Sequence, residues 1–294
     1  MTLEQLRIFV AVAERAHLTQ AATALNLSPS AVSAAIRALE DRYQAQLFNR
    51  VGRGIELTET GRSFLPEARA VLAAAAAAAL ALTESATLER GQLRLAASQT
   101  VGDYWLPAPL MRFHAAHPGI ALSLTLGNTE TVAQAVLAGN ADLGFIEGEI
   151  DEPALQSRIV ASDRLVIVTA PEHRWVAQPP DAAELAAGRW VLREAGSGTR
   201  SAFAAALAAT WIELDALDVV MTLPANEAIL AAVSSGPYAG AMSERAAETA
   251  IAAGRLAAID YPLQPRSFRM LWHKERYRTR AARAFEAQLP PLSG

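Results

Sequence analysis

Residues 18–39 read LTQAATALNLSPSAVSAAIRAL, and this stretch decides the fold of the first part of the chain. The apolar spacing of residues 18–25 predicts a short helix, and Asn26 lies in the tight connection that follows it. Ser28 is a good helix N-cap and Pro29 fits the first helical position, so another helix is expected to begin here. Two helices joined by so short a turn are typical of a helix-turn-helix.

The helix expected over residues 29–44 has two unlike faces. At about 100° per residue, one face is apolar and is expected in the core: Val32, Ile36 and Leu39. The opposite face carries small or polar side chains and one arginine: Ser30, Ser33, Ala34 and Arg37. Side chains this short allow a close approach to another surface. The alternative is an ordinary amphipathic helix in a small bundle, packed against a preceding helix near residues 3–13.

Residues 47–58 read LFNRVGRGIELT, a two-strand pattern around a glycine-containing turn. A hairpin beside a helix-turn-helix would bring Arg50 and Arg53 close to phosphates, where cations displace condensed counterions. The alternative is a surface hairpin with solvated arginines.

One long helix is expected from about residue 60 to residue 89. Its heptad-like seam is anchored by Leu65, Leu72 and Leu82, a spacing that favours pairing of two such helices. The helix is therefore predicted to be a dimerisation strut. The alternative is that it packs on its own domain.

From Gly91 onward, short apolar runs alternate with helical patterns, which predicts an α/β fold with mainly parallel sheets. Strands are expected near residues 93–97, 120–126, 142–146, 164–169, 190–193, 217–222, 239–242, 256–259 and 268–272. Helices are expected near residues 104–116, 131–138, 201–213 and 227–235.

Small polar residues follow three of these strands, and ligands of open α/β sheets bind beyond the carboxyl ends of strands. The candidate ligand-binding residues are Ser98, Gln99 and Thr100 after the first strand, Glu147 and Gly148 after another, and Ser197, Gly198, Thr199 and Arg200 at a helix start, with Asn226 beginning a further helix. Free backbone N–H groups at a helix start favour an anion. The alternative for each exit is a capped helix start without a ligand.

Composition excludes several other functions. The 294 residues contain no cysteine, so disulfides, thiol nucleophiles and cysteine-based metal sites are ruled out, and no metal or cofactor is expected. The HExxH, GxSxG and Walker A motifs are missing, which argues against an enzyme. No apolar run is long enough to span a bilayer and no secretory signal is recognisable, so a cytoplasmic location is expected. A small-molecule binding protein or α/β enzyme with an incidental helical N-terminus is the alternative function.

The first 65 residues resemble a LysR-type transcriptional regulator. The resemblance is carried by residues 6–14, 19–28, 30–33, 36–40, 47–50 and 57–61. The length and layout of the remaining chain agree with it. The resemblance implies a winged helix-turn-helix over residues 1–60, a linker helix over 61–90 and an effector domain over 91–294 that is similar to periplasmic binding proteins.

This resemblance implies that the third helix enters the major groove of double-stranded DNA. The residues that it assigns to DNA contact are Thr19, Gln20, Ser28, Pro29, Ser30, Ser33, Arg37, Arg50 and Arg53. Many members carry longer polar side chains where this chain has Pro29, Ala34 and Ala35, so Ser33, Arg37 and DNA shape are expected to contribute more to recognition. A homodimer or homotetramer would bind an interrupted dyad.

The resemblance also implies a ligand cleft between two effector subdomains, residues 91–162 with 266–294 and residues 163–265. Two crossing segments are expected near residues 162–164 and 262–266. Residues 193–200, REAGSGTR, resemble the subset that includes regulators of sulfur assimilation and carbon fixation, which points to a small anion as effector. Glu147 would oppose an anion unless it faces away or is protonated.

Overall fold

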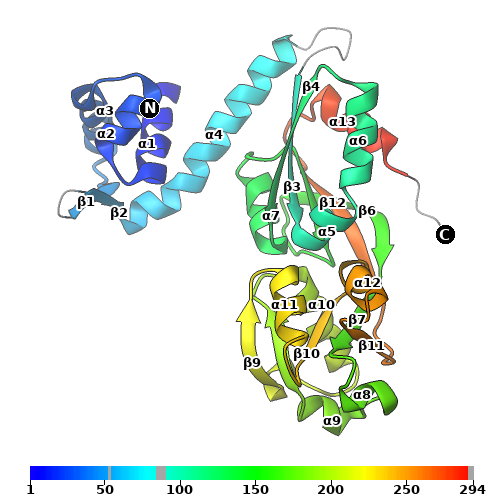
Figure 1. The fold of residues 1–294 in the computed structure, drawn as a ribbon. Coiled ribbons are helices and arrows are strands. Elements are labelled where there is room, and N and C mark those ends of the chain that lie inside the picture. The colour runs from blue at the N-terminus through cyan, green and yellow to red at the C-terminus, as the bar shows by residue number, and fades with distance from the viewer. Residues whose placement is uncertain (52–53, 84–90, 291–294) are drawn as a thin grey trace. The chain divides into compact units, whose positions relative to one another are not determined.

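The computed structural model describes residues 1–51, 54–83 and 91–290. They form two compact units, one containing residues 1–83 and the other containing residues 91–136 and 141–290. Within the described ranges, every helix is too short or too polar to cross a membrane. Figure 1 shows the helices and strands of both units.

The N-terminal unit is a winged helix-turn-helix followed by a long helix. Its elements are α1 (Leu3–Arg15), α2 (Leu18–Leu25), α3 (Pro29–Tyr43), β1 (Phe48–Val51), β2 (Gly54–Leu57) and α4 (Glu59–Thr83). The predicted start of α3 is confirmed, because Ser28 Oγ accepts a hydrogen bond from the backbone N–H of Ala31 at 3.2 Å. Asn26 ends α2 in the left-handed region, with φ +55°, which permits the tight turn.

Val32, Ile36 and Leu39 lie in the core of this unit, as the helical spacing predicts. The ring of Phe9 packs against those of Phe48 and Phe64, with ring centroids 5.4 and 5.1 Å apart. These contacts join α1 to the hairpin and to α4, so the wing and the long helix share the core of the helix-turn-helix.

The first part of α4 packs on its own unit, as the alternative for this helix expects, and pairing of two such helices stays a prediction. Leu65 and Leu72 pack against the helix-turn-helix core, and Ala68 is almost fully buried. Arg69 Nη2 also lies 2.9 Å from Glu14 Oε1 of α1. The apolar seam covers core residues that α1 and α3 leave open. The side chain of Leu82, and Arg53 in the wing, lie outside the described residues.

The second unit contains two five-stranded sheets with helices on both faces (Figure 1). The first sheet has the strand order β4-β3-β5-β12-β6. Its strands are β3 (Gly91–Ser98), β4 (Ile120–Gly127), β5 (Leu143–Glu147), β6 (Leu155–Asp163) and β12 (Arg266–His273). Its helices are α5 (Gln99–Tyr104), α6 (Pro107–Ala116), α7 (Thr129–Leu137) and α13 (Arg280–Gln288). The second sheet has the strand order β11-β7-β10-β8-β9. Its strands are β7 (Leu165–Thr169), β8 (Arg189–Arg193), β9 (Asp218–Leu223), β10 (Ala239–Ser243) and β11 (Ala257–Ile259). Its helices are α8 (Arg174–Ala177), α9 (Ala182–Ala186), α10 (Gly198–Ala208), α11 (Asn226–Val233) and α12 (Glu244–Ala252), with a 3₁₀ turn, η1 (Leu214–Ala216).

Both sheets are mixed, so the prediction of mainly parallel sheets was wrong. β3 is parallel to β4 and β5, and β8 is parallel to β9 and β10. The strands next to the chain crossings are antiparallel: β12 to β5 and β6, and β7 to β10 and β11. A strand that returns from the other sheet enters from the opposite end, which reverses its direction.

The chain passes between the sheets twice. The first crossing is the single residue Arg164, between the end of β6 and the start of β7, and the second is residues 260–265 between β11 and β12. Arg266 pairs with Asp163 in the register of β12 and β6, so the two crossings begin and end side by side.

We expect Gly61→Ala to destabilise the N-terminal unit. A Cβ at Gly61 would lie 2.2 Å from the carbonyl oxygen of Leu47, so the start of α4 would have to move away from the hairpin. The expected loss is about 1–3 kcal/mol of unfolding free energy, measured by denaturant unfolding of the full chain. Gly54→Ala is the control, because its Cβ would meet nothing nearer than 3.6 Å. Equal effects of the two substitutions would contradict the steric explanation.

Candidate functional site

The three predicted strand exits come together where the two sheets of the second unit face each other. Ser98 ends β3 and Glu147 ends β5 in the first sheet, whereas Ser197 precedes α10 and Asn226 begins α11 in the second. All four side chains are buried. The helix predicted near residues 104–116 is α6, and a separate short helix, α5, begins at Gln99, so the first exit is itself a helix start.

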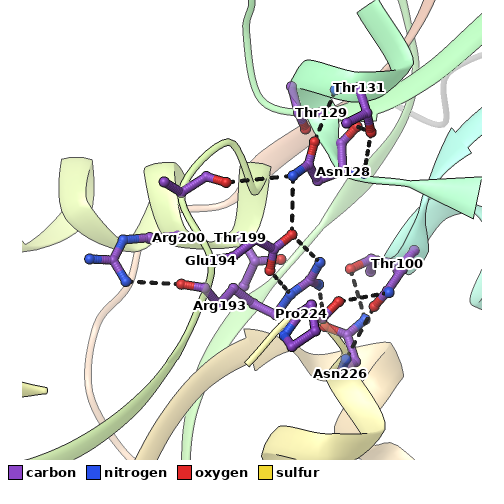
Figure 2. Close-up of polar contacts among 12 residues, drawn as sticks. Thr100, Asn128, Thr129, Thr131, Arg193, Glu194, Thr199, Arg200, Pro224 and Asn226 are labelled. Atoms are coloured by element: carbon purple, nitrogen blue, oxygen red, sulfur yellow. Dashed lines mark hydrogen bonds and ion pairs between the residues drawn. The ribbon is translucent and has the colours of Figure 1, made fainter. Parts of the chain in front are cut away.

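Hydrogen bonds join the first exit directly to the start of α11. Gln99 Nε2 donates to the carbonyl oxygen of Pro224 at 2.8 Å, and Gln99 Oε1 accepts from the backbone N–H of Asn226 at 3.2 Å. Asn226 Nδ2 donates to Thr100 Oγ1 at 3.3 Å (Figure 2). Three of the predicted ligand-binding residues therefore hold the two sheets together.

Arg193, at the end of β8, connects this contact to a second one. Its Nη1 donates to Asn226 Oδ1 at 2.9 Å, and its Nε and Nη2 donate to the two carboxylate oxygens of Glu194 at 2.8 and 3.1 Å. Glu194 Oε1 in turn accepts from Asn128 Nδ2 of the first sheet at 3.2 Å (Figure 2). A buried arginine thus bridges two contacts between the sheets.

The start of α10 approaches Glu147 closely. A Cβ at Gly198 would lie 2.6 Å from the carbonyl oxygen of Glu147 and 2.6 Å from Thr129 Oγ1, so a glycine is needed for this approach. Thr129 Oγ1 lies 3.4 Å from Glu147 Oε2. Gly148 follows with φ +76°, and its N–H donates to the carbonyl oxygen of Ser267.

Thr199 contacts an arginine from the crossing. Its Oγ1 accepts from Arg266 Nη1 at 3.0 Å, and Arg266 Nε donates to Asp163 Oδ2 at 2.8 Å. Arg200 differs from its neighbours: its Nη1 donates to the carbonyl oxygen of Arg193 at 2.9 Å, on the side of the Arg193 backbone away from Asn226 (Figure 2). Arg200 therefore braces α10 against β8, and its guanidinium is turned away from the other candidates.

Sequence reasoning missed Asn128, Thr129, Arg193 and Arg266 as site residues. Asn128 and Thr129 follow the predicted strand 120–126 after one glycine, so the rule applied to the other exits would have found them. Arg193 is the first residue of the REAGSGTR motif. Arg266 carries no local signal, because its partners Asp163 and Thr199 are 103 and 67 residues away in sequence.

Burial and charge shift two pKa values in this region. Burial alone would raise the pKa of Glu194, but hydrogen bonds from the Arg193 side chain and the backbone, the Arg193 charge and the Asn128 hydrogen bond outweigh it and lower that pKa. The pKa of Asp103 in α5 is raised by burial and by the negative charge of Glu227, although the Arg193 charge opposes this. Glu227 Oε1 accepts from the Tyr104 hydroxyl at 2.8 Å.

The candidate DNA-binding residues gather on α2, α3 and the hairpin of the N-terminal unit. The exposed ones are Thr19, Gln20, Ser28, Pro29, Ser30, Arg37 and Arg50. Ser33 is half-buried, and its Oγ accepts from Arg37 Nη1 at 2.8 Å. Ser28 Oγ and Ser30 Oγ lie 3.0 Å apart. The outward face of α3 is therefore short-chained, as predicted, with Arg37 as its cation.

Two family models match this chain. Residues 3–62 match the bacterial regulatory helix-turn-helix protein, lysR family, and residues 86–291 match the LysR substrate binding domain. The chain belongs to the LysR family. The named relatives are transcriptional regulators, so the family assignment does not support the alternative of an enzyme.

Relatives of this LysR-family chain match along almost its whole length. It is 37% identical to an uncharacterized HTH-type transcriptional regulator, YeiE of Escherichia coli K12, covering 97% of this chain and 96% of the relative. It is 31% identical to a RuBisCO operon transcriptional regulator of Allochromatium vinosum, covering 97% and 94%. Full-length OxyR from Pseudomonas aeruginosa has a similar fold, with a TM-score of 0.72, 21% identity and coverage of 98% and 94%. CbnR in complex with its target DNA has a TM-score of 0.69, 22% identity and coverage of 98% and 99%.

We expect Glu194→Gln to lower the thermal stability of this LysR-family chain at neutral pH. A carboxyl whose pKa is depressed by folding contributes stability above its unfolded pKa of about 4.3, and this contribution is lost as pH falls through the depressed value. The difference in Tm between wild type and variant should therefore shrink as pH falls below about 4. Glu213→Gln, at an exposed glutamate, is the control. A Tm difference that does not change with pH would contradict this account.

Proposed function

We propose that this LysR-family chain regulates transcription by placing α3 in the major groove of promoter DNA. The exposed, short-chained face of α3 with Arg37, together with Arg50 on the hairpin, supports this proposal. Small side chains permit close approach to base edges, and arginines supply the phosphate contacts that dominate affinity. CbnR, a LysR-family regulator of similar fold, has been solved in complex with its target DNA, which agrees with this function.

We expect Arg37→Ala to weaken binding of promoter DNA about tenfold or more, because a good base or phosphate contact by arginine is worth roughly 1–3 kcal/mol. If Arg37 contacts a phosphate, the slope of log affinity against log salt should become shallower by about 1. The measurement is titration of a labelled promoter fragment across a salt series. Arg112→Ala is the matched control, because it removes the same charge from an exposed position on α6. Equal loss in both variants would count against a role of α3.

The second part of the proposal is that a small anionic effector binds between the two sheets of the second unit. Gln99, Thr100 and Asn226 join the sheets there, and Arg193 and Arg266 supply buried positive charge. An effector that inserts among these groups would shift the balance between closed and open arrangements. A regulatory domain of similar fold, that of CcmR from Synechocystis, has been solved in complex with 2-PG.

The remaining expectations belong to the same proposal. They are the limits of the DNA-binding domain, linker and two effector subdomains, a homodimer or homotetramer paired in part through α4, an interrupted dyad as the binding site, and a cytoplasmic location. Pairing through α4 would use the part of the helix beyond Leu72, since the preceding turns pack on the helix-turn-helix core.

The proposal is tested on the DNA upstream of the protein's own gene. Binding is measured across a salt series, with and without sulfite, sulfate and small carboxylates. We expect sequence-selective binding with a steep salt dependence, and a change in affinity or footprint with at least one anion. No selective binding under any condition would overturn the regulator proposal, whereas selective binding that no anion changes would overturn only the effector class.

A further inference from the structure

A buried arginine at the crossing of the chain has one hydrogen-bonding group unused. The side chain of Arg266 is 4% exposed. Its Nε is bound to Asp163 Oδ2 and its Nη1 to Thr199 Oγ1. Asp163 is itself held by Ser243, whose Oγ lies 2.7 Å from Asp163 Oδ1. The orientation of the guanidinium is therefore fixed from two sides.

Nη2 of Arg266 has no hydrogen-bond partner among the described residues. Ser98 Oγ, also buried, likewise has none within the described ranges. Ser98 is a separate group: continued strand register puts it level with Ile146 of β5 and Arg269 of β12, three residues or about 10 Å along β12 from Arg266. Buried polar groups are almost always hydrogen-bonded, so the unused Nη2 of the buried Arg266 points to a polar ligand at this end of β12.

Glu147 ends β5, the strand next to β12, and its carboxylate faces Arg266. Its side chain is 2% exposed, and its Oε1 forms an ion pair with Arg266 Nη2 at 4.0 Å, which is too long for a hydrogen bond. Any anion that binds Nη2 must therefore approach this carboxyl group. Asp163 already neutralises part of the arginine charge, so an anion with no proton of its own would meet repulsion from Glu147 that Arg266 alone does not cancel.

We propose that this site selects an anion that also carries an O–H donor. An anionic oxygen of the ligand accepts from Arg266 Nη2, and the O–H of the same ligand donates to Glu147. This chemistry is shared by an oxyanion that keeps a proton and by a hydroxycarboxylate. The inference rests on the proposed effector cleft and adds the recognition rule to it.

The preference for an anion with an O–H donor follows from which group, Glu147 or Arg266, each kind of ligand would leave unpaired. A buried carboxylate that receives a hydrogen bond from the ligand becomes part of the site, whereas the same carboxylate facing a bare anionic oxygen is repelled by it. Glu147 thus rejects fully deprotonated anions, and Arg266 rejects neutral ligands.

The test compares matched anions by titration calorimetry on the full-length chain at pH 7. Phosphate and sulfate are both tetrahedral, but only phosphate keeps a proton at this pH; glycolate and acetate differ by one hydroxyl group. We expect the donor-bearing member of at least one pair to bind on the order of a hundredfold more tightly. A difference between phosphate and sulfate would indicate an inorganic oxyanion, and a difference between glycolate and acetate would indicate a hydroxycarboxylate.

Glu147→Gln tests the residue itself, because an amide can donate to an anionic oxygen as well as accept from an O–H. We expect the preference for the donor-bearing anion to fall at least tenfold, mainly because the anion without an O–H donor binds the variant more tightly. Glu149→Gln is the matched control: Glu149 lies two residues away, its side chain is 83% exposed, and it pairs with Arg269. The control should keep the wild-type preference.

The outcomes separate this inference from the function on which it rests. If phosphate and sulfate bind equally, glycolate and acetate bind equally, and the bound anions alter DNA binding, the donor rule is overturned and the effector proposal stands. If none of the four anions binds or alters DNA binding, both are overturned. The wild-type ratios decide the rule even if Glu147→Gln fails to fold.

Discussion

The ion pair between Arg266 and Asp163 holds together the two places where the chain passes from one sheet to the other. Both side chains are buried, so the pair is stable only because Ser243 and Thr199 supply further hydrogen bonds. Removing either partner would leave a buried charge, at a cost of about 3–5 kcal/mol. The same arginine faces Glu147. Architecture and recognition therefore depend on one guanidinium group, and a ligand that binds it acts at the junction of the two sheets.

Most hydrogen bonds between the sheets involve side chains, beside one backbone bond from the Glu130 N–H to the Gly196 carbonyl oxygen and the packing of Tyr104 on the apolar core of the second sheet. Gln99, Thr100, Asn128, Asn226 and Glu194 make side-chain hydrogen bonds, and each of these groups could bond equally well to a ligand or to water. Exchanging one polar partner for another changes the free energy little, since the net value of a hydrogen bond is about 1 kcal/mol. Polar contacts of this kind keep the closed arrangement close in free energy to an open one, which is what an effector needs in order to shift it.

Much of this fold is predictable from local signals. Ser28 and Pro29 mark the start of α3, and the exits after β3 and β5 follow from strand patterns alone. Strand β6 was missed because it is largely exposed. Helices α8, α9, α12 and α13 were also missed, although α13 has a clear local signal in its N-cap Thr279 and its apolar face of Ala281, Ala282 and Phe285. The antiparallel strands and Arg266 were missed for another reason. Both depend on the chain returning from the second sheet, a relation between residues about a hundred positions apart that no local pattern contains.

Arg164 is the whole of the first crossing, so the second sheet is joined there to the first by only a few backbone torsions. A link this short acts as a pivot: it allows rotation but almost no translation. In a rotation, displacement grows with distance from the axis. The site lies beside the pivot, whereas α8 and α9 lie at the far end of the second sheet (Figure 1). A rotation that moves the ligand contacts by a fraction of a hydrogen-bond length would therefore move α8 and α9, at the far end of the second sheet, by a larger distance.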